Sequence, residues 1–319
     1  MSKPKIIFMG TPEFGAIILE NIIKEDFPPI LTITSPNKPV GRKQIPTPPP
    51  VKVVSEKYKI SVLQPKEIKD AAKEISLIKP DLIVVAAFGR FLPEEILKIP
   101  KYGSLNLHPS LLPKYRGSSP IQYAILQGEK ETGTTIFLID NEMDHGPILS
   151  QEKTTIGKNE TAEQLHNRLA VLSAKLLINT IPAWLRKEIK LKPQDEEKAT
   201  YTKILKKGDG KIDWKKTAEE IENKIRAFYP WPGSFTFWKK KDIKGKITIK
   251  ILKARVLKNN IDKKTYPIGK TLIAPPNSLC IQCKKGFLIA DIVQEEGKKP
   301  MKSEDFIRGH KNFIGTILK

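Results

Sequence analysis

Residues 81–87 read Asp-Leu-Ile-Val-Val-Ala-Ala, a run whose only polar residue is the first. A strand with one face in water alternates apolar and polar residues, whereas a strand buried on both faces is apolar throughout. The run therefore predicts a central strand of a parallel sheet. Further short apolar segments that we expect to be strands lie at residues 6–9, 30–34, 60–63, 104–107 and 134–139.

Helix-forming segments separate these strands. Apolar residues from Phe14 to Ile22 recur at helical spacing, and similar spacing predicts helices over residues 66–78 and 161–186. Strands that alternate with helices predict an α/β fold with a doubly wound, mostly parallel, Rossmann-like sheet. Ligands of such sheets bind beyond the carboxyl ends of the strands, so we expect the functional site there.

The C-terminal part of the chain has a different pattern. Residues 187–207 are polar and charged with little periodicity, and we interpret them as a linker. A helix is expected over residues 217–228, and five short strands between Gly- and Pro-containing turns then predict a small OB-like β-barrel. The expected organisation is an α/β domain over residues 1–186, the linker, and a basic β-barrel domain over residues 208–319.

Charge is distributed unevenly along the 319 residues, which include 56 Lys and Arg and 35 Asp and Glu, a net charge of +21. Residues 1–200 contain 28 basic and 23 acidic residues, a net of +5, whereas residues 201–319 contain 28 and 12, a net of +16. This asymmetry predicts that the C-terminal part binds a polyanion, although a general enrichment in lysine would also make a surface basic. The sequence has no run of about 18 consecutive apolar residues, so it predicts no membrane-spanning helix. We therefore expect a cytoplasmic protein that does not bind membranes.

Two cysteines, Cys280 and Cys283, form a C-x-x-C pattern of the kind found in some metal and redox sites. They fall in a predicted strand, where residues three apart face opposite sides of the sheet. No second cysteine pair or histidine cluster completes a set of four ligands. We therefore expect no metal site and no redox role at these cysteines.

Three polar residues form a candidate catalytic set. Asn106 and His108 lie two residues apart in a predicted strand, so their side chains share one face at its carboxyl end. An amide donor beside an imidazole can bind a developing oxyanion and move a proton. Asp144 follows the next predicted strand, and a carboxylate near His108 would fix the tautomer and the charge of the ring, whereas His145 should point elsewhere. The plainer alternatives are a core histidine and a turn-forming aspartate.

Two loops are candidates for ligand contact. Residues 110–117, Ser-Leu-Leu-Pro-Lys-Tyr-Arg-Gly, follow the strand of His108, and function in α/β proteins concentrates in such loops. Residues 36–44 are basic and rich in Pro and Gly, which suits a phosphate backbone, although most such loops are simply solvated. The turn at residues 10–15 lacks the glycine pattern of a dinucleotide site and the lysine of an ATP-binding loop. A nucleotide cofactor is therefore not expected.

These motifs resemble the methionyl-tRNA formyltransferases, a family that uses formyltetrahydrofolate, over nearly the whole chain. The set formed by Asn-x-His, Ser-Leu-Leu-Pro and the distal Asp is shared by formyltetrahydrofolate-using transferases generally. The N-terminal Met-Gly-Thr-Pro-Glu-Phe and the C-terminal domain are similar to the tRNA enzymes in particular. The segments that carry the resemblance are residues 8–14, 41–42, 48–52, 64–65, 106–117, 120–122, 131–135, 143–149, 225–233 and 306–310.

The resemblance implies transfer of a formyl group from 10-formyltetrahydrofolate to the amino group of methionine on initiator tRNA, for translation initiation, by a monomer that uses no metal. It implies catalytic roles for Asn106, His108 and Asp144. The residues that it places against folate or against tRNA phosphates are, for folate, Ser110, Leu111, Leu112, Pro113, Phe88 and Gly89, and for tRNA, Lys38, Arg42 and Lys43. Phe88 stands where the family often has tyrosine, so one hydroxyl group is missing.

Other functions fit part of these observations. Formyltransferases that act on an amino sugar or a glycinamide ribonucleotide, and formyltetrahydrofolate hydrolases, would share Asn106, His108 and Asp144. The transferases have no need of a C-terminal domain with a charge of +16, and a hydrolase would normally carry a different accessory domain. A non-catalytic RNA-binding protein on an α/β scaffold would have no need of the three polar residues.

Overall fold

A computed structural model of the chain describes residues 3–41, 43–240, 245–257 and 266–319. Contacts between Cα atoms divide the chain into two compact units, which we describe separately. The α/β unit comprises residues 1–120, 131–155 and 165–202, and the β-rich unit comprises residues 121–130, 156–164 and 203–319. The domain boundaries expected from the sequence remain a proposal.

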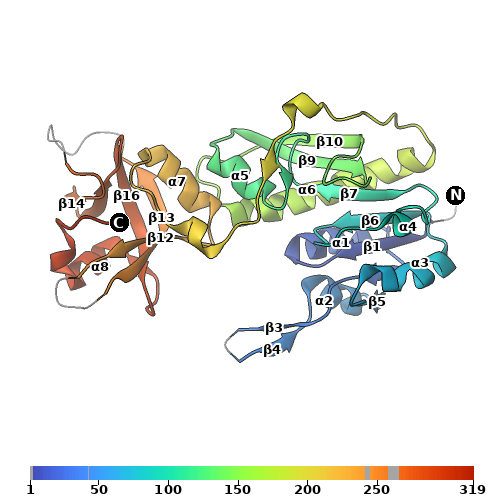
Figure 1. Cartoon of the computed structure of the whole chain (residues 1–319), viewed down its shortest axis with the longest axis horizontal. Coiled ribbons are helices and arrows are strands. Elements are labelled where there is room, and N and C mark those ends of the chain that lie inside the picture. The colour runs from blue at the N-terminus through green and yellow to red at the C-terminus, as the bar shows by residue number, and fades with distance from the viewer. Residues whose placement is uncertain (1–2, 42, 241–244, 258–265) are drawn as a thin grey trace. The chain divides into compact units, whose positions relative to one another are not determined.

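The α/β unit is built on a seven-stranded sheet in the order β10-β9-β7-β6-β1-β2-β5 (Figure 1). Strands β5, β2, β1, β6 and β7 run parallel, whereas β9 pairs antiparallel with both β7 and β10. The apolar run of residues 81–87 forms β6 beside β1 in the middle of the parallel part, and its strand residues are all buried. The strands are β1 (Ile6–Gly10), β2 (Leu31–Ile33), β5 (Ser61–Leu63), β6 (Leu82–Ala86), β7 (Ser104–His108), β9 (Glu131–Leu138) and β10 (Ile148–Thr155).

Helices pack on both faces of this sheet, because strand residues alternate between the faces and both are apolar. On one face, Ile7, Met9, Ile83 and Val85 share a buried cluster with residues of η1, α3 and α4. The expected helix over residues 66–78 is a 3₁₀ turn, η1, followed by α3. The helices of the α/β unit are α1 (Glu13–Lys24), α2 (Pro50–Lys57), η1 (Ile68–Ala71), α3 (Ala72–Ile78), α4 (Glu94–Leu97), η2 (Glu196–Lys198) and most of α6 (Ala162–Leu185).

Helix α6 is the only helix of the described chain that is long and apolar enough, by length and composition, to cross a membrane. Its apolar residues have a different explanation in this fold, because Leu169, Leu177 and Ile181 are fully buried. The Ser173 hydroxyl lies 2.6 Å from that of Thr134 on β9. One face of α6 is therefore a core face of the α/β unit, as the leucine spacing predicts.

The first part of the predicted linker, residues 187–202, belongs to the α/β unit. Lys192 forms an antiparallel bridge with Ile148 at the start of β10. Strand β11 (Tyr201–Thr202) pairs in parallel with β8 (Arg116–Gly117), in the loop that follows β7. The polar composition of this segment thus does not prevent it from packing beside that loop.

The β-rich unit has an antiparallel sheet in the order β12-β13-β16-β15-β14, with β17 on β16. Trp238, Phe306 and Phe313 are buried in its core and contact one another edge to face. A mostly parallel α/β sheet followed by an antiparallel β domain confirms the predicted fold class. The elements are α5 (Pro120–Leu126), η3 (Lys207–Gly210), α7 (Ala218–Ala227), β12 (Ser234–Trp238), β13 (Ile247–Val256), β14 (Thr271–Ala274), β15 (Ser278–Gln282), β16 (Phe287–Glu295), β17 (Met301–Lys302), α8 (Ser303–Gly309) and η4 (Lys311–Phe313).

Helix α7 begins at a capping box, which explains the boundary expected at residue 217. The Thr217 hydroxyl accepts a hydrogen bond from the Glu220 N–H at 3.2 Å, and the Glu220 carboxylate accepts one from the Thr217 N–H at 2.8 Å. These bonds satisfy two backbone donors at the helix end. Ile221 and Ile225 are buried on the inner face of the helix, against the sheet.

The two cysteines lie in different clusters of the β-rich unit. Cys280 packs with Phe287 and Ile289, and Cys283 packs with Leu288 and Ile281. Their opposite faces agree with strand geometry, and burial raises the pKa of both thiols to about 12. Both thiols should therefore stay protonated at neutral pH.

We predict that neither cysteine reacts appreciably with a disulfide reagent at pH 8 while the protein is folded, because the thiolate is the nucleophile. Both should react after unfolding in guanidinium chloride. Absorbance of the released thiol reports the number of reacting groups. Rapid reaction of either cysteine in the folded protein would contradict the burial of these thiols.

Candidate active site

The carboxyl ends of three parallel strands meet at one edge of the α/β sheet. Gly10 at the end of β1 pairs with Ala86 at the end of β6, and Asn106 on β7 pairs with Val85 on β6. The Thr11 hydroxyl donates to the Phe88 carbonyl oxygen at 3.2 Å, which connects two of the loops that leave this edge. The candidate catalytic set lies at the end of β7.

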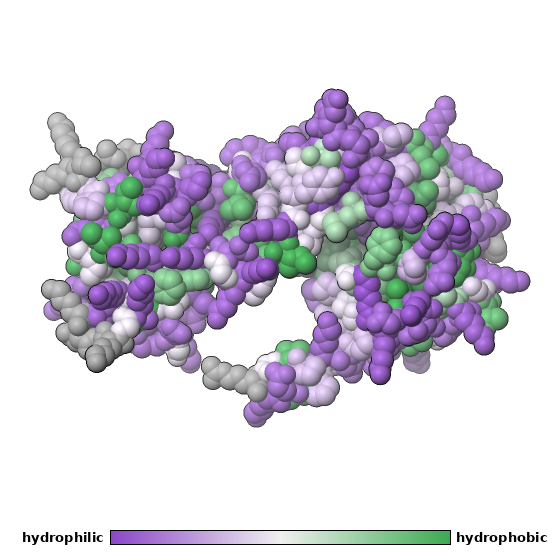
Figure 2. Space-filling view, viewed as in Figure 1, coloured by the Kyte–Doolittle hydropathy of each residue, from purple (hydrophilic) through white to green (hydrophobic). Residues whose placement is uncertain are grey.

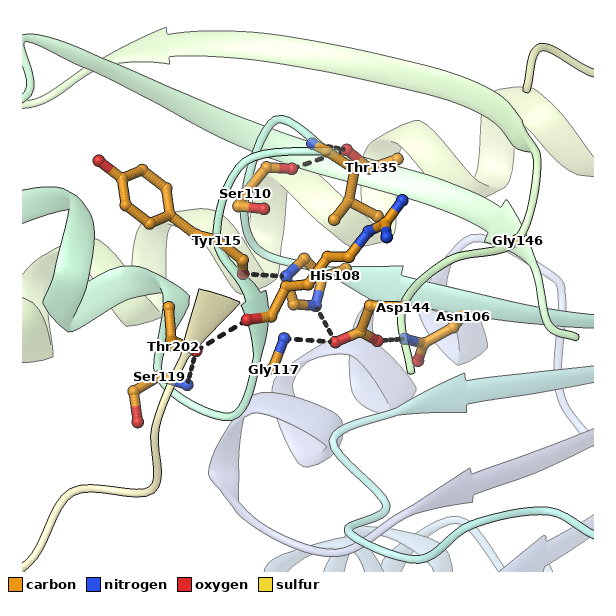
Figure 3. A network of polar contacts seen from close by, with 12 residues as sticks. Asn106, His108, Ser110, Tyr115, Gly117, Ser119, Thr135, Asp144, Gly146 and Thr202 are labelled. Atoms are coloured by element: carbon orange, nitrogen blue, oxygen red, sulfur yellow. Dashed lines mark hydrogen bonds and ion pairs between the residues drawn. The ribbon is translucent and has the colours of Figure 1, made fainter. Parts of the chain in front are cut away.

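The structure brings together the three polar residues expected from the sequence (Figure 3). Asn106 Nδ2 lies 3.5 Å from Asp144 Oδ1, and His108 Nδ1 lies 3.6 Å from Asp144 Oδ2. The His108 side chain is 5% exposed and the Asp144 side chain is 16% exposed. A nearly buried carboxylate therefore faces both an amide and an imidazole.

The contact of Nε2, the second ring nitrogen of His108, decides which tautomer the neutral ring adopts. Nε2 lies 2.9 Å from the Tyr115 carbonyl oxygen, and because a carbonyl can only accept, Nε2 must carry hydrogen. In the neutral ring Nδ1 would then present a lone pair to the Asp144 carboxylate.

Asp144 is held in an uncommon backbone conformation. Its φ is +50°, and Ala87 and Tyr115, which also lie beside the site, have φ of +50° and +63°. Such residues cost about 1–3 kcal/mol each and persist where surrounding contacts fix them. One such contact is the Gly117 N–H, which donates to Asp144 Oδ2 at 2.8 Å.

Two glycines allow the Asp144 loop to approach its neighbours closely. A Cβ on Gly146 would lie 1.8 Å from the Leu138 carbonyl oxygen at the end of β9. Gly117 has a φ of +101°, and a Cβ there would lie 2.6 Å from the Thr202 carbonyl oxygen. Only glycine fits at either position without a backbone shift.

The expected folate segment, Ser110 to Pro113, is fixed by hydrogen bonds to the sheet. The Thr135 hydroxyl donates to the Ser110 carbonyl oxygen at 2.7 Å and accepts from the Leu112 N–H at 3.1 Å. Leu112 is buried against Phe137, whereas Leu111 and Pro113 are half-buried. Leu112 thus acts in the core, and the segment presents its backbone and its half-buried side chains.

The other folate residue pair expected from the resemblance lies after β6. The ring of Phe88 is 3% exposed and is part of the core, so this position offers no polar side-chain contact. Gly89 has a φ of +74°, and the space that a Cβ would occupy is open. The loop therefore offers backbone groups to a ligand.

The expected tRNA loop contains a hairpin, β3 (Lys38–Val40) paired with β4 (Ile45–Thr47), which extends from the rest of the α/β unit (Figure 1). Lys38 and Lys43 are exposed, and Arg42 lies outside the described residues. Val40 and Ile45 are more than half exposed. Hydrophilic side chains and a small hydrophobic area lie together on the hairpin (Figure 2).

Sequence reasoning missed a buried cation and its partners. Arg116 is 1% exposed, and its guanidinium contacts the Glu196 carboxylate at 2.5 and 2.8 Å and Gln194 Oε1 at 2.8 and 3.1 Å. This pairing lowers the pKa of Glu196. Gln194 and Glu196 lie in a charged segment without periodicity, so no local pattern indicated their place at the site.

His145, next to Asp144, points away from the catalytic set. Its Nδ1 lies 2.7 Å from Asp140 Oδ2, and its Nε2 lies 3.5 Å from Glu196 Oε1. The hydrogen bond with Asp140 raises the pKa of His145. Among the residues that the structure describes, no group of three or more His, Cys, Asp or Glu could hold a metal ion.

Comparison with known proteins assigns the chain to a family. Residues 4–181 match the formyl transferase family and residues 204–311 match the formyl transferase C-terminal domain. A methionyl-tRNA formyltransferase of Halalkalibacterium halodurans is 40% identical over 98% of each chain, and one of Syntrophus aciditrophicus is 40% identical over all of both. This chain belongs to the methionyl-tRNA formyltransferase family.

Solved structures of other proteins have the same fold. An N-formyltransferase of Helicobacter canadensis, with folinic acid and dTDP-3-aminofucose, has a TM-score of 0.64 at 23% identity, over 90% of this chain and 98% of that chain. HypX of Aquifex aeolicus with tetrahydrofolic acid has a TM-score of 0.63 at 16% identity, over 98% of this chain and 48% of that chain. At these identities the likeness concerns the fold alone.

We predict that Gly146→Ala lowers kcat for formyl transfer by about 100-fold, since the added Cβ forces the Asp144 loop from the end of β9 and small displacements of catalytic groups have effects of this size. Steady-state kinetics measures the change. Gly208→Ala is the matched control, because a Cβ there meets no atom within 4 Å. Equal activities of the two variants would contradict the role of the close approach.

Proposed function

We propose that this protein transfers the formyl group of 10-formyltetrahydrofolate to the α-amino group of methionyl initiator tRNA. Full-length identity of 40% with methionyl-tRNA formyltransferases is the observation that carries the proposal. The carboxylate between Asn106 and His108 supports it, because an amide can stabilise an oxyanion and an imidazole and a carboxylate can move protons during acyl transfer to an amine.

Asn106 is the proposed oxyanion donor. Its 3.5 Å contact with Asp144 is long for a hydrogen bond, and an amide nitrogen has two hydrogens, so one can point toward a ligand at the sheet edge. 10-Formyltetrahydrofolate would supply the formyl carbon, whose oxygen becomes negative as the amine attacks. Asn106 stabilises that charge at its Nδ2.

His108 and Asp144 are proposed to control the protons. The α-amino group has a pKa of about 7.7–8.0 in peptides, so a substantial fraction of the amine is neutral near pH 7.5. The amine gives up a proton after it attacks. This proton passes, directly or through a water molecule, to Asp144, which is the nearest carboxylate. His108 Nδ1 lies 3.6 Å from Asp144 Oδ2, so the ring stands beside the carboxylate. Transfer would break the bond between the formyl carbon and N10 of tetrahydrofolate, and that nitrogen would take up the proton that the amine loses.

The expected cofactor-binding and tRNA-binding residues complete the proposal. The backbone of Ser110–Pro113 would contact folate at the sheet edge that also holds Asn106. The open space at Gly89 would leave room for the ligand there. Lys38 and Lys43, with Arg42, would contact tRNA phosphates. The net charge of +16 over residues 201–319 supports a second tRNA-binding surface in the C-terminal part. We further propose a cytoplasmic monomer that needs no metal.

A formyltransferase for a nucleotide-linked amino sugar is the main alternative, because such enzymes share this fold. Full-length identity and the basic C-terminal part favour tRNA over a sugar. Incubation with labelled 10-formyltetrahydrofolate and either charged initiator tRNA, charged elongator tRNA or an amino sugar nucleotide distinguishes the functions. Formylation of the sugar without formylation of initiator tRNA would refute the proposal.

We predict that Asn106→Ala lowers kcat for formyl transfer by about 100- to 1,000-fold, which is the usual effect of removing one oxyanion donor. Affinity for methionyl-tRNA should stay within about twofold, because the side chain binds no phosphate. Single-turnover kinetics and filter binding give the two quantities. The exposed Asn159→Ala is the control, and normal turnover in Asn106→Ala would remove this residue from the mechanism.

We predict that the double substitution Lys38→Glu and Lys43→Glu weakens tRNA binding and reduces the slope of log K against log salt by about 1 for each phosphate that the protein no longer neutralises. Formyl transfer at saturating tRNA should change little. The double substitution Lys69→Glu and Lys73→Glu, also exposed, changes the net charge equally outside the hairpin. The hairpin does not touch tRNA if both pairs have the same effect.

A further inference from the structure

We propose that Gln194 and Arg116 are positioning residues for Asp144. The proposal rests on the proposed function, because it assigns a device that holds the catalytic carboxylate. Gln194 donates from Nε2 to the backbone carbonyl oxygens of Asp144 and Gly146, both at 2.9 Å. One side chain therefore binds the backbone of the loop both before and after His145.

Arg116 fixes which way the Gln194 amide points. Guanidinium nitrogens only donate, and Nε and Nη2 of Arg116 both contact Gln194 Oε1. The amide oxygen must therefore face Arg116, so its NH₂ group must face the two carbonyls. Each hydrogen and each lone pair of the amide has a partner, and the side chain has one orientation.

Arg116 itself is fixed by three contacts besides Gln194. Its guanidinium forms a bidentate pair with Glu196, and Nη1 donates to the Tyr201 hydroxyl at 3.2 Å. A buried cation is strongly destabilising without such partners. All of these partners lie in residues 194–201. Arg116 therefore has its full set of contacts only when that segment packs onto the rest of the α/β unit.

Strand β8, which contains Arg116, also contacts Asp144 directly. Gly117, next to Arg116 in β8, donates its N–H to Asp144 Oδ2 at 2.8 Å, while Gln194 holds the backbone of Asp144. Side chain and backbone are thus both connected to β8. This double connection explains how Asp144 keeps a φ of +50°.

Gln194 and Arg116 act on the chemical step rather than on substrate binding. Arg116 is 1% exposed and its guanidinium hydrogens are engaged with Gln194, Glu196 and Tyr201. Its charge is therefore directed at the segment and not at tRNA phosphates. Displacement of Asp144 should lower kcat and leave KM for tRNA nearly unchanged.

Gln194→Glu tests the proposal, because a carboxylate oxygen replaces the NH₂ group that faces two carbonyls. We expect kcat for formyl transfer to fall by about 100-fold with KM for tRNA within about twofold. The pH dependence of kcat should also change, since the His108–Asp144 distance changes. The exposed Gln127→Glu makes the same charge change and should behave as wild type.

Amide hydrogen exchange gives a readout that requires no substrate. In Gln194→Glu, exchange at residues 143–146 should rise at least tenfold, and exchange in β1 and β6 should be unchanged. If Gln194→Glu does not fold, Arg116→Lys serves instead, because lysine cannot bond Gln194 and Glu196 at once. The proposal is overturned if the exchange of residues 143–146 is unchanged in a folded variant. Loop loosening in a protein that formylates no tRNA would refute only the proposed function.

Discussion

The carboxylate of Asp144 is the group on which the site depends. It is mostly buried, and a buried carboxylate is stable only when hydrogen-bond donors replace the water that it loses. The Gly117 N–H and the Asn106 amide supply such donors from two other segments of the chain, and the His108 ring lies 3.6 Å from the carboxylate. The end of β7, the loop after it and the close approaches at Gly117 and Gly146 bring these groups together.

The contacts around Asp144 also explain why residues beyond helix α6 belong to the site. A backbone with positive φ returns to its common conformation unless other groups hold it, and Gln194 supplies two of the bonds that do so. Gln194 in turn requires Arg116, and the burial of Arg116 requires Glu196. A charged segment with no hydrophobic pattern is thereby ordered through ion pairs and amide bonds instead of apolar burial.

The two units of the chain use different physical interactions. The α/β unit places a few directional hydrogen bonds at one sheet edge, where distance and orientation decide the chemistry. The C-terminal part carries most of the net charge, and attraction between charges needs little directional precision. A transferase that acts on one small group at the end of a large polyanion needs both, which is why the proposed function accounts for the whole chain.

The sequence by itself determined most strands of the parallel sheet, several of its helices and the chemical type of the proposed catalytic set. Apolar runs such as residues 81–87 and helical spacing record burial directly, and strand alternation places Asn106 and His108 on one face. The charge and the motifs pointed to tRNA and to the family. Local pattern was less informative at residues 66–78, where a 3₁₀ turn precedes the helix.

Only the tertiary structure decided how the site is held. It placed Leu112 and Phe88 in the core, directed His108 Nε2 to a carbonyl and brought Gln194 to Asp144, 50 residues away in the sequence. Hydrophobic periodicity reports which face of an element is buried, but it carries no record of which distant polar groups satisfy one another. Those pairings arise from the register of β8 with β11 and from the closeness that Gly117 and Gly146 allow.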